Sequence, residues 1–230
     1  MSTPTTVQLK ESAAIASAER LADGMIVGLG SGSTATLAVA AIGKRVKEGL
    51  KIVGIPTSER TADQARSLGI PLATFADYSK IDIAIDGADE VELVTLNLIK
   101  GGGGNQLREK IVAEASARFI IVVDGGKIVK QLGTRAKLPV EVAQFGWQAT
   151  ARRLTELKVN PALRLNKEQK PYTTDGGNYI LDCATGPIPS AGLLENELDG
   201  VVGVVEHGLF LNMATEVLIG AAEGVKSLTK

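Results

Sequence analysis

Short apolar runs and longer stretches of mixed polarity alternate along the first half of the chain. The apolar runs are typical of strands buried in a parallel sheet, and they lie at residues 25–30, 51–57, 70–75, 80–87 and 119–126. The stretches between them repeat apolar residues at helical spacing, and they cover residues 9–22, 35–49, 58–69 and 105–118. Strands that alternate with helices through short connections predict an α/β fold, a Rossmann-like parallel sheet with helices on both faces.

The pattern changes from about Leu138. Strands are expected at 138–145, 161–165, 171–185 and 201–210, and helices at 146–158 and 190–200. This β-α-β-β-α-β order predicts a smaller ferredoxin-like α+β domain. The last stretch, 214–229, is expected to return to the first domain. We therefore predict a Rossmann-like domain formed by residues 1–135 and 208–230, and a ferredoxin-like domain formed by residues 136–207.

Composition narrows the class of protein. The chain has 230 residues, of which 44% are hydrophobic, enough for a large buried core. A formal net charge of −1 provides no basic surface for nucleic acid or an anionic membrane. No apolar run reaches the roughly 20 residues of a membrane span, so we expect a soluble, cytoplasmic protein.

Cysteine and histidine each occur once, as Cys183 and His207. A single cysteine fits a reducing compartment, and the pair lacks the usual ligands of a zinc site. Both residues lie in the predicted smaller domain, where packing explains them better than catalysis. We expect neither a metal nor a cofactor.

A glycine- and serine-rich loop follows the first predicted strand. Gly28, Gly30 and Gly32 precede Ser33 and Thr34 at a predicted helix start. Backbone N–H groups and the helix dipole favour an anion such as phosphate there. The alternative is that Ser33 and Thr34 only cap the helix. A similar loop places Thr57 and Ser58 after the second strand. Capping by Ser58 alone accounts for it, and a ligand role is the alternative.

Two aspartates stand where another predicted strand ends. Asp86 closes the run 80–87, and Asp89 follows after two small residues. Ligands of open parallel sheets bind beyond the carboxyl ends of the strands. Two such carboxylates can keep an acid and a base together at neutral pH. The alternative is a solvated turn with an aspartate cap.

The segment KGGGGNQLREK, residues 100–110, sets four glycines beside Lys100, Arg108 and Glu109. Glycine loses the most backbone entropy on folding, so the run is either a loose surface turn or a loop that approaches a ligand. In the helix that follows, Leu107, Ile111 and Ala115 are predicted to form the apolar stripe. Glu109 then points about 200° from Leu107, toward solvent or a ligand. A solvated face of the helix is the ordinary alternative.

Six segments together resemble the ribose-5-phosphate isomerases of type A. They are GLGSGSTA, DIAIDGADEV, LIKGGGG followed by LREK, VVDGGK, KLPVEV and TDGGNYILD, in this order. The likeness runs from about Lys10 to the C-terminal segment. One departure is Asn105-Gln106, where the family usually has small apolar residues.

The resemblance implies an aldose–ketose isomerase of the pentose phosphate pathway, which interconverts D-ribose 5-phosphate and D-ribulose 5-phosphate without an obligatory metal. It implies that Glu109 is the base that carries a proton between C2 and C1 through an enediolate. It also implies that Asp86 is the ring-opening acid/base, with Asp89 beside it, and that Lys100 faces the developing oxyanion. The substrate-binding residues implied by the resemblance are Ser31, Gly32, Ser33, Thr34, Gly101, Gly102, Gly103, Lys127 and Lys10.

Two other functions are weighed against the isomerase. A non-catalytic sugar-phosphate sensor of a related fold would normally carry an added DNA-binding helix pair, for which the chain has no spare residues. A nucleotide-dependent dehydrogenase would need a glycine where Ser33 stands, and an acidic residue near Arg60. The expected partner is therefore a sugar phosphate, with no nucleic acid and no membrane. From the family resemblance we also expect a homodimer or homotetramer.

Overall fold

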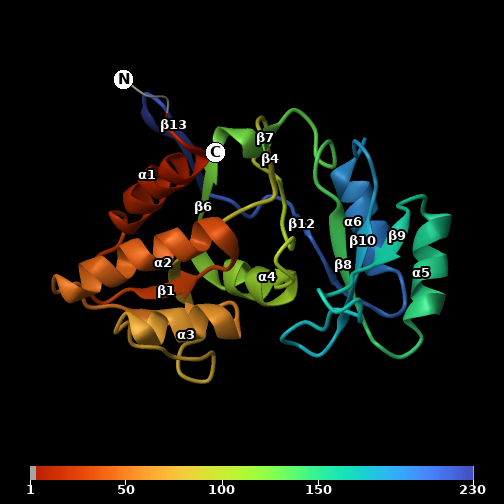
Figure 1. The fold of residues 1–230 in the computed structure, drawn as a ribbon, viewed down its shortest axis with the longest axis horizontal. Helices are drawn as coiled ribbons and strands as arrows, with labels where there is room; N and C mark the ends of the chain where they lie inside the picture. Colours follow the sequence, from red (N-terminus) through yellow and green to blue (C-terminus); the bar gives the residue numbers. More distant parts are fainter. Residues whose placement is uncertain (1–3, 230) are drawn as a thin grey trace. The chain divides into compact units, whose positions relative to one another are not determined.

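The computed structural model describes residues 4–229, which form two compact units (Figure 1). The first unit contains the residues up to Ala88, Arg108–Ile128 and the residues from Met213 onward. The second contains Asp89–Leu107 and Val129–Asn212. The domain limits predicted from the sequence stay a prediction, and their outermost positions, 1 and 230, lie outside the described residues.

A six-stranded sheet organises the first unit. Its order is β14-β13-β6-β3-β1-β2. All neighbouring strands run parallel except β14, which pairs with β13 in antiparallel fashion. The strands are β1 (Ile26–Leu29), β2 (Val53–Pro56), β3 (Ile81–Asp86), β6 (Ser116–Asp124), β13 (Glu216–Ala221) and β14 (Gly224–Thr229). The C-terminal stretch thus returns to the first sheet as predicted, and it does so as a hairpin.

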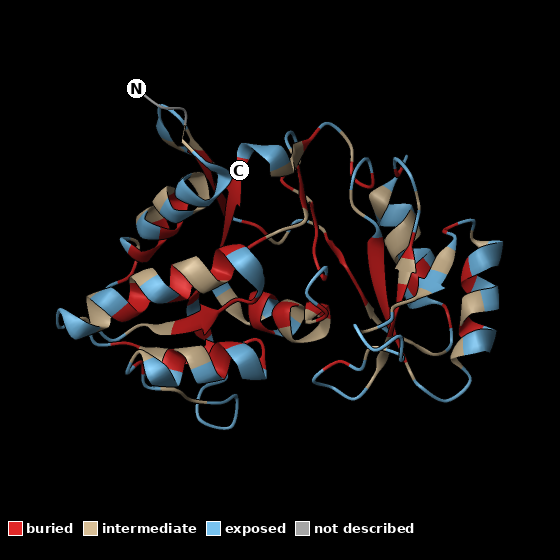
Figure 2. Ribbon diagram, in the orientation of Figure 1, coloured by how far each residue is buried: buried red, intermediate tan, exposed pale blue. Residues whose placement is uncertain are grey.

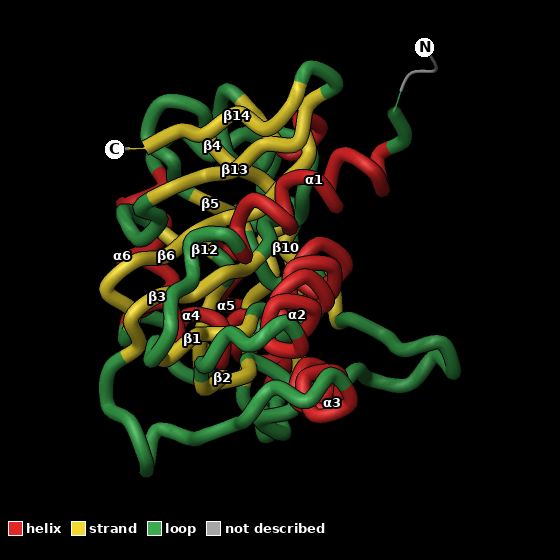
Figure 3. The backbone as a smooth tube through the Cα atoms, turned by 90° about the vertical axis from the view of Figure 1, so that its left-hand side faces the viewer, coloured by secondary structure: helices red, strands yellow, loops and turns green. Residues whose placement is uncertain are grey.

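Helices cover both faces of this sheet. Alternate residues of a strand point to opposite sides, and in these strands the side chains on both sides pack against helices. Val27 and Leu29 pack into one core with residues of α1, α2 and α3, which lie along one side of the sheet (Figure 3). Gly28 faces α4, since a Cβ on it would stand 2.5 Å from Val112. The helices are α1 (Thr6–Ala18), α2 (Gly32–Lys47), α3 (Glu59–Ser67), α4 (Gln106–Glu114) and the 3-10 helix η1 (Gly125–Lys127).

The central strands β1 and β3 are almost entirely buried (Figure 2). The prediction of a parallel sheet covered on two faces is confirmed. None of the helices within residues 4–229 is both long and apolar enough to cross a lipid bilayer.

The strand predicted at 70–75 is wrong. Only one bridge forms there, between Gly54 and Leu72. A turn follows at once, because the backbone N–H and hydroxyl of Thr74 both donate to the Asp77 carboxylate, at 2.9 Å and 3.0 Å. This turn satisfies the backbone locally and ends the extended conformation.

The second unit contains the ferredoxin-like arrangement. Its antiparallel sheet has the order β11-β8-β10-β9, with one helix in each of the two crossover connections, as predicted. The elements are β8 (Leu138–Val142), α5 (Trp147–Glu156), β9 (Pro161–Leu163), β10 (Tyr179–Cys183), α6 (Ala191–Asp199) and β11 (Val204–His207). Cys183 lies in the core of this unit, where burial, and then the charge of Asp182, raises the pKa of its thiol to about 12.

A second small sheet has the order β12-β5-β4-β7. Its strands are β4 (Glu90–Glu92), β5 (Leu98–Ile99), β7 (Ile128–Val129) and β12 (Leu209–Phe210).

The single strand predicted at 201–210 is divided in two. β11 pairs with β8, whereas β12 pairs with β5 in the other sheet. The division falls at Gly208, whose backbone N–H donates to Pro139 and whose carbonyl accepts from the N–H of Lys100. A Cβ on Gly208 would stand 2.2 Å from the carbonyl oxygen of Lys100, so only glycine permits the chain to pass from one sheet to the other here.

Glu216 links several elements of the first unit. Its carboxylate accepts from Arg20 at 2.9 Å, from Arg118 at 3.2 Å and from the Ser227 hydroxyl at 2.9 Å. Burial alone would raise the pKa of Glu216, but the hydrogen bonds and the two positive charges outweigh it and hold this pKa below its ordinary value. A carboxylate with a lowered pKa stabilises the fold above its unfolded pKa, and the contribution is lost as the pH falls through the folded pKa.

We expect Glu216→Gln to lower the free energy of unfolding at pH 7 by on the order of 1 kcal/mol, since the arginines are partly exposed. The difference from the parent protein should shrink as the pH falls below the ordinary glutamate pKa. Urea unfolding at pH 7, 5 and 3 measures it, with the exposed Glu48→Gln as a control that should behave like the parent. A deficit that does not change with pH would contradict an ionic contribution.

Candidate active site

The carboxylate of Asp86 organises the carboxyl end of the sheet in the first unit. Asp86 ends β3 and is 2% exposed. Its Oδ1 accepts hydrogen bonds from the backbone N–H groups of Ser31 at 3.0 Å and Gly87 at 2.8 Å. A Cβ on Gly30 would stand 2.2 Å from the same oxygen, so the glycine loop after β1 makes room for this carboxylate. A solvated turn is therefore ruled out for Asp86.

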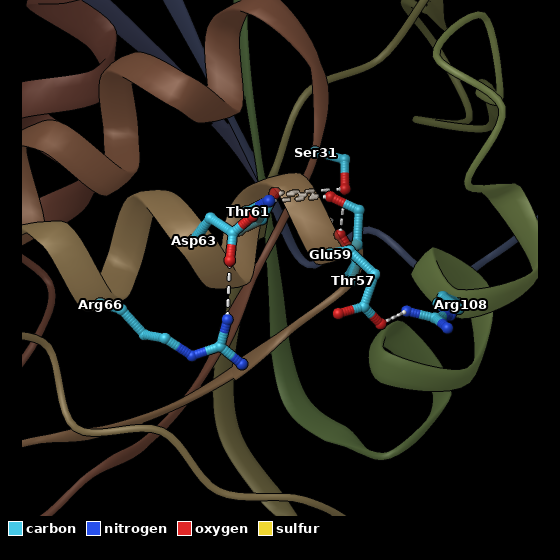
Figure 4. Close-up of polar contacts among 8 residues, drawn as sticks. Ser31, Thr57, Glu59, Thr61, Asp63, Arg66 and Arg108 are labelled. Atoms are coloured by element: carbon cyan, nitrogen blue, oxygen red, sulfur yellow. Dashed lines mark hydrogen bonds and ion pairs between the residues drawn. The ribbon is translucent and has the colours of Figure 1, made fainter. Parts of the chain in front are cut away.

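Hydroxyl groups connect the loops that follow β1 and β2 (Figure 4). Ser31 Oγ lies 2.5 Å from Thr57 Oγ1 and 3.5 Å from Thr61 Oγ1. Ser31 is the N-cap residue of α2, but its side chain makes no capping hydrogen bond. Ser58 caps α3 by accepting from the N–H of Thr61 at 3.1 Å. The capping alternative thus holds for Ser58, whereas the contact between Thr57 and Ser31 could not be seen in the sequence because it joins separate loops.

The start of α2 is open to solvent and has a lysine beside it. Gly32 and Ser33 are exposed, and Thr34 is buried against Gly87. Nζ of Lys10, on α1, lies 3.4 Å from Ser33 Oγ. The structure therefore brings Lys10 to the glycine- and serine-rich loop, and its role in binding substrate stays a prediction.

Lys10 also faces an aspartate that sequence reasoning did not single out. Its Nζ lies 3.7 Å from Asp124 Oδ2 at the end of β6. Asp124 accepts from the N–H of Gly126 at 2.8 Å and so caps η1, the short helix that contains Lys127. The glycines of VVDGGK signal this turn, but nothing local connects it with Lys10.

The remaining predicted residues, apart from Glu109, belong to the second unit. Asp89 Oδ2 accepts from the backbone N–H of Gly102 at 2.7 Å. Lys100 is 2% exposed, and its Nζ lies 5.4 Å from the centre of the Phe210 ring. A lysine that is almost fully buried is rare in proteins, so this position is set apart from an ordinary surface lysine.

The glycine run at 101–104 is held in a defined conformation. Gly101 and Gly104 have φ of +100° and +84°, values that favour glycine. A Cβ on Gly102 would stand 2.7 Å from Asp89 Oδ1, and one on Gly104 would stand 2.6 Å from the Tyr172 ring. A Cβ on Gly103 would meet only Asn105 Nδ2, at an ordinary contact distance of 3.8 Å. Three of the four glycines are therefore needed for positive φ or close approach, so the alternative of a loose surface turn is wrong.

Helix α4 presents a different face to the core from the one predicted. Its buried residues are Gln106, Glu109, Val112 and Ala113. Glu109 is 4% exposed, whereas Ile111 is 49% exposed. The predicted stripe through Leu107, Ile111 and Ala115 is therefore wrong, because apolar spacing alone does not account for the polar side chains that this helix buries.

An ion pair anchors α4 beside Glu109. Arg108 Nη1 lies 2.8 Å from Glu59 Oε1 at the start of α3 (Figure 4). The hydrogen bond and the positive charge of Arg108 hold the pKa of Glu59 below its ordinary value. The pair is solvent-exposed, so it adds little to stability.

A pocket of about 660 Å³ lies in the first unit beside this ion pair. None of the site residues predicted from the sequence lines it. Its lining residues include Pro56, Ser58, Glu59, Arg66, Phe75, Arg108 and Ile111. This pocket therefore does not coincide with the predicted site.

Residues 4–229 contain no group of three or more histidine, cysteine, aspartate or glutamate side chains placed to hold a metal ion. The chemistry available at the residues described above is that of carboxylates, lysines, hydroxyl groups and backbone N–H groups.

Comparison with protein families matches residues 53–224 to the family model described as ribose 5-phosphate isomerase A (phosphoriboisomerase A). The chain is 54% identical over 222 residues to the ribose-5-phosphate isomerase A of Synechococcus sp. (strain JA-3-3Ab), with 96% of each chain covered. It is 55% identical over 221 residues to the enzyme of the same name from Gloeobacter violaceus, again with 96% of each chain covered.

Solved structures agree with these matches. Ribose 5-phosphate isomerase A from Methanocaldococcus jannaschii superposes with a TM-score of 0.94 at 41% identity, covering 98% of this chain and 100% of the other. A D-ribose-5-phosphate isomerase in complex with phospho-erythronic acid superposes with a TM-score of 0.95 at 35% identity, covering 99% and 100%. The chain therefore belongs to the ribose 5-phosphate isomerase A family.

Proposed function

We propose that the protein interconverts D-ribose 5-phosphate and D-ribulose 5-phosphate in the pentose phosphate pathway. The observation that carries this proposal is the 54% identity to a ribose-5-phosphate isomerase A over 96% of both chains. The sensor alternative is not favoured, because the relatives compared above are named as isomerases.

Glu109 is the proposed base. Its carboxylate takes the proton from C2 of the open-chain aldose, which leaves an enediolate with negative charge on the oxygen of C1. The same carboxyl group returns the proton to C1, and the hydroxyl proton of C2 moves to the C1 oxygen, so the product is the ketose. One carboxylate can serve both carbons because they are bonded neighbours. The burial of Glu109 at 4% exposure supports this role, since a glutamate with no task beyond solubility would face water.

Lys100 is proposed to stabilise the negative oxygen of the enediolate. A fixed cation near a developing oxyanion is commonly the largest single contribution to such a reaction. The buried position of Lys100 supports the proposal because its charge is shielded less by water than that of a surface lysine. Asp89, held by the N–H of Gly102, is proposed to contact the sugar.

Asp86 is proposed to open the sugar ring by moving a proton between the ring oxygen and the C1 hydroxyl. Its Oδ1 already accepts two backbone hydrogen bonds, so its orientation is fixed before a substrate arrives. Ser31, held beside Thr57, is proposed to contact the substrate from the same loop.

The phosphate group is proposed to bind at the start of α2. The exposed Gly32 and Ser33 and the buried Thr34 supply N–H groups and hydroxyls at the positive end of the helix dipole. Lys10 lies beside Ser33, and Lys127 follows β6 at the same edge of the sheet. The glycines at 101–103 are proposed to allow close approach of the sugar. No metal or cofactor takes part in this proposal.

We further propose that the protein is cytoplasmic and forms a homodimer or a homotetramer. Sedimentation equilibrium of the purified chain at micromolar concentration should give a mass two or four times that of the 24.0 kDa chain. A monomer mass over the whole concentration range would contradict the oligomer.

Glu109→Gln should lower kcat by about 10³-fold or more, because the amide cannot accept the C2 proton. A coupled assay for ribulose 5-phosphate formation, run with excess chelator, measures the rate. Glu114→Gln is the matched control, an exposed glutamate on the same helix, and it should keep the parental rate. Near-parental turnover by a folded Glu109→Gln variant would remove Glu109 from the role of base.

Lys100→Met keeps the length of the side chain but removes its charge. We expect kcat to fall about 10²-fold or more while KM changes far less, because the charge acts on the enediolate rather than on the bound aldose. Lys130→Met, at an exposed position, is the control. If KM rises and kcat is unchanged in Lys100→Met, the lysine binds substrate and does not stabilise the intermediate.

A further inference from the structure

Gln106 carries a buried amide that nothing in the described chain satisfies. The residue is 0% exposed. Neither its Nε2 nor its Oε1 has a hydrogen-bond partner within residues 4–229. Native proteins pair the large majority of buried side-chain polar atoms, so two orphaned atoms on one side chain need an explanation.

The amide lies against Gly101, one of the glycines proposed to allow close approach of the sugar. Gln106 is the first residue of α4. Its Oε1 would be 2.8 Å from a Cβ on Gly101, so the amide lies against the backbone that follows Lys100. Gln106 also shares the buried face of α4 with Glu109, one turn further along the helix.

An unsatisfied buried amide lowers the free energy of unfolding, and replacing the glutamine by an apolar residue would avoid this loss. A buried polar group without a partner destabilises a protein more than an apolar side chain of the same shape. A methionine or leucine at position 106 would fill the same space without the penalty. The glutamine is therefore explained by a partner that arrives with the ligand.

The chemistry of that partner follows from the amide itself. Nε2 donates two hydrogen bonds and Oε1 accepts, so the group suits a hydroxyl, which can both donate and accept. We propose that Gln106 binds a hydroxyl group of the pentose chain and contributes to substrate specificity. This inference rests on the proposed isomerase function. It adds a substrate contact at position 106, where the family usually has a small apolar residue.

The test compares Gln106→Met with the parent protein. Methionine keeps the unbranched shape and removes both polar atoms. We expect KM for ribose 5-phosphate to rise about 5- to 20-fold with kcat within about 3-fold, since a hydrogen bond present before and during reaction affects binding alone. The inhibition constant of inorganic phosphate, which has no sugar hydroxyl, should stay within about 2-fold.

The melting temperature of the ligand-free protein provides a second measurement. It should not fall in Gln106→Met and should rise by up to about 6 °C, because the unsatisfied amide is gone. The gain in melting temperature on adding ribose 5-phosphate should be smaller than in the parent. Gln106→Ala should show the same increase in KM despite a cavity, and it replaces the methionine variant if that one does not fold.

Asn105→Ala is the control. Asn105 is the neighbouring amide, half-buried, with one long hydrogen bond of 3.4 Å to the Gly103 carbonyl. Its removal should leave KM unchanged.

Three results would overturn the proposal. The first is a parental KM in Gln106→Met, which is also the result if water alone satisfies the amide. The second is a parallel rise of KM and of the inhibition constant of phosphate. The third is an equal rise of KM in Asn105→Ala. If the parent protein forms no ribulose 5-phosphate, the isomerase proposal fails instead, and the thermal shift with ribose 5-phosphate still tests Gln106.

Discussion

The carboxylate of Asp86 accepts from the N–H groups of Ser31 and Gly87, and this contact is possible only because residue 30 has no side chain. It fixes the loop after β1 against the end of β3. Ser31 is thereby placed where its hydroxyl meets Thr57, and the starts of α2 and α3 are linked as a result. The proposed phosphate site, at the first turn of α2, depends on that position. One buried acid thus helps to position the loops that follow β1 and β2.

The second unit repeats this device with Asp89. Its carboxylate holds the N–H of Gly102, and a side chain at that glycine would collide with it. In both units a carboxylate accepts hydrogen bonds from backbone N–H groups. The orientation of the carboxylate is therefore set by the main chain rather than by flexible side chains. Preorganisation of this kind lowers the reorganisation needed when charge develops during a reaction. The glycine at position 102 is explained on the same basis.

The parallel strands and the ferredoxin-like order could be predicted because buried strands and amphipathic helices leave clear periodic patterns. The face of α4 could not, because the helix buries Gln106 and Glu109, whereas Ile111 lies beside a surface pocket. Apolar spacing misplaces a face whose buried residues include polar side chains. The break at Gly208 and the turn at Thr74 and Asp77 were missed because they depend on contacts with residues far away in the chain or on local side-chain hydrogen bonds.

Candidate residues close in the chain were easier to identify than pairs brought together by folding. Short motifs contain Asp86, Asp89, Lys100 and Glu109, so these residues could be identified as candidates from the sequence. The contacts of Lys10 with Ser33 and Asp124 join helix, loop and strand end, and no local pattern signals them. Gln106 stood out in the sequence only as a departure from the family, and its unsatisfied amide becomes visible only once burial is known.

The deep burial of Cys183, the one cysteine of the chain, has a practical consequence. With its thiol held protonated far above neutral pH, the native surface carries no competing nucleophilic sulfur. A cysteine introduced at an exposed position would therefore accept a fluorophore or spin label selectively, without removal of the natural residue. One such label in each unit would make the distance between the two units, and its response to a sugar phosphate, measurable in solution.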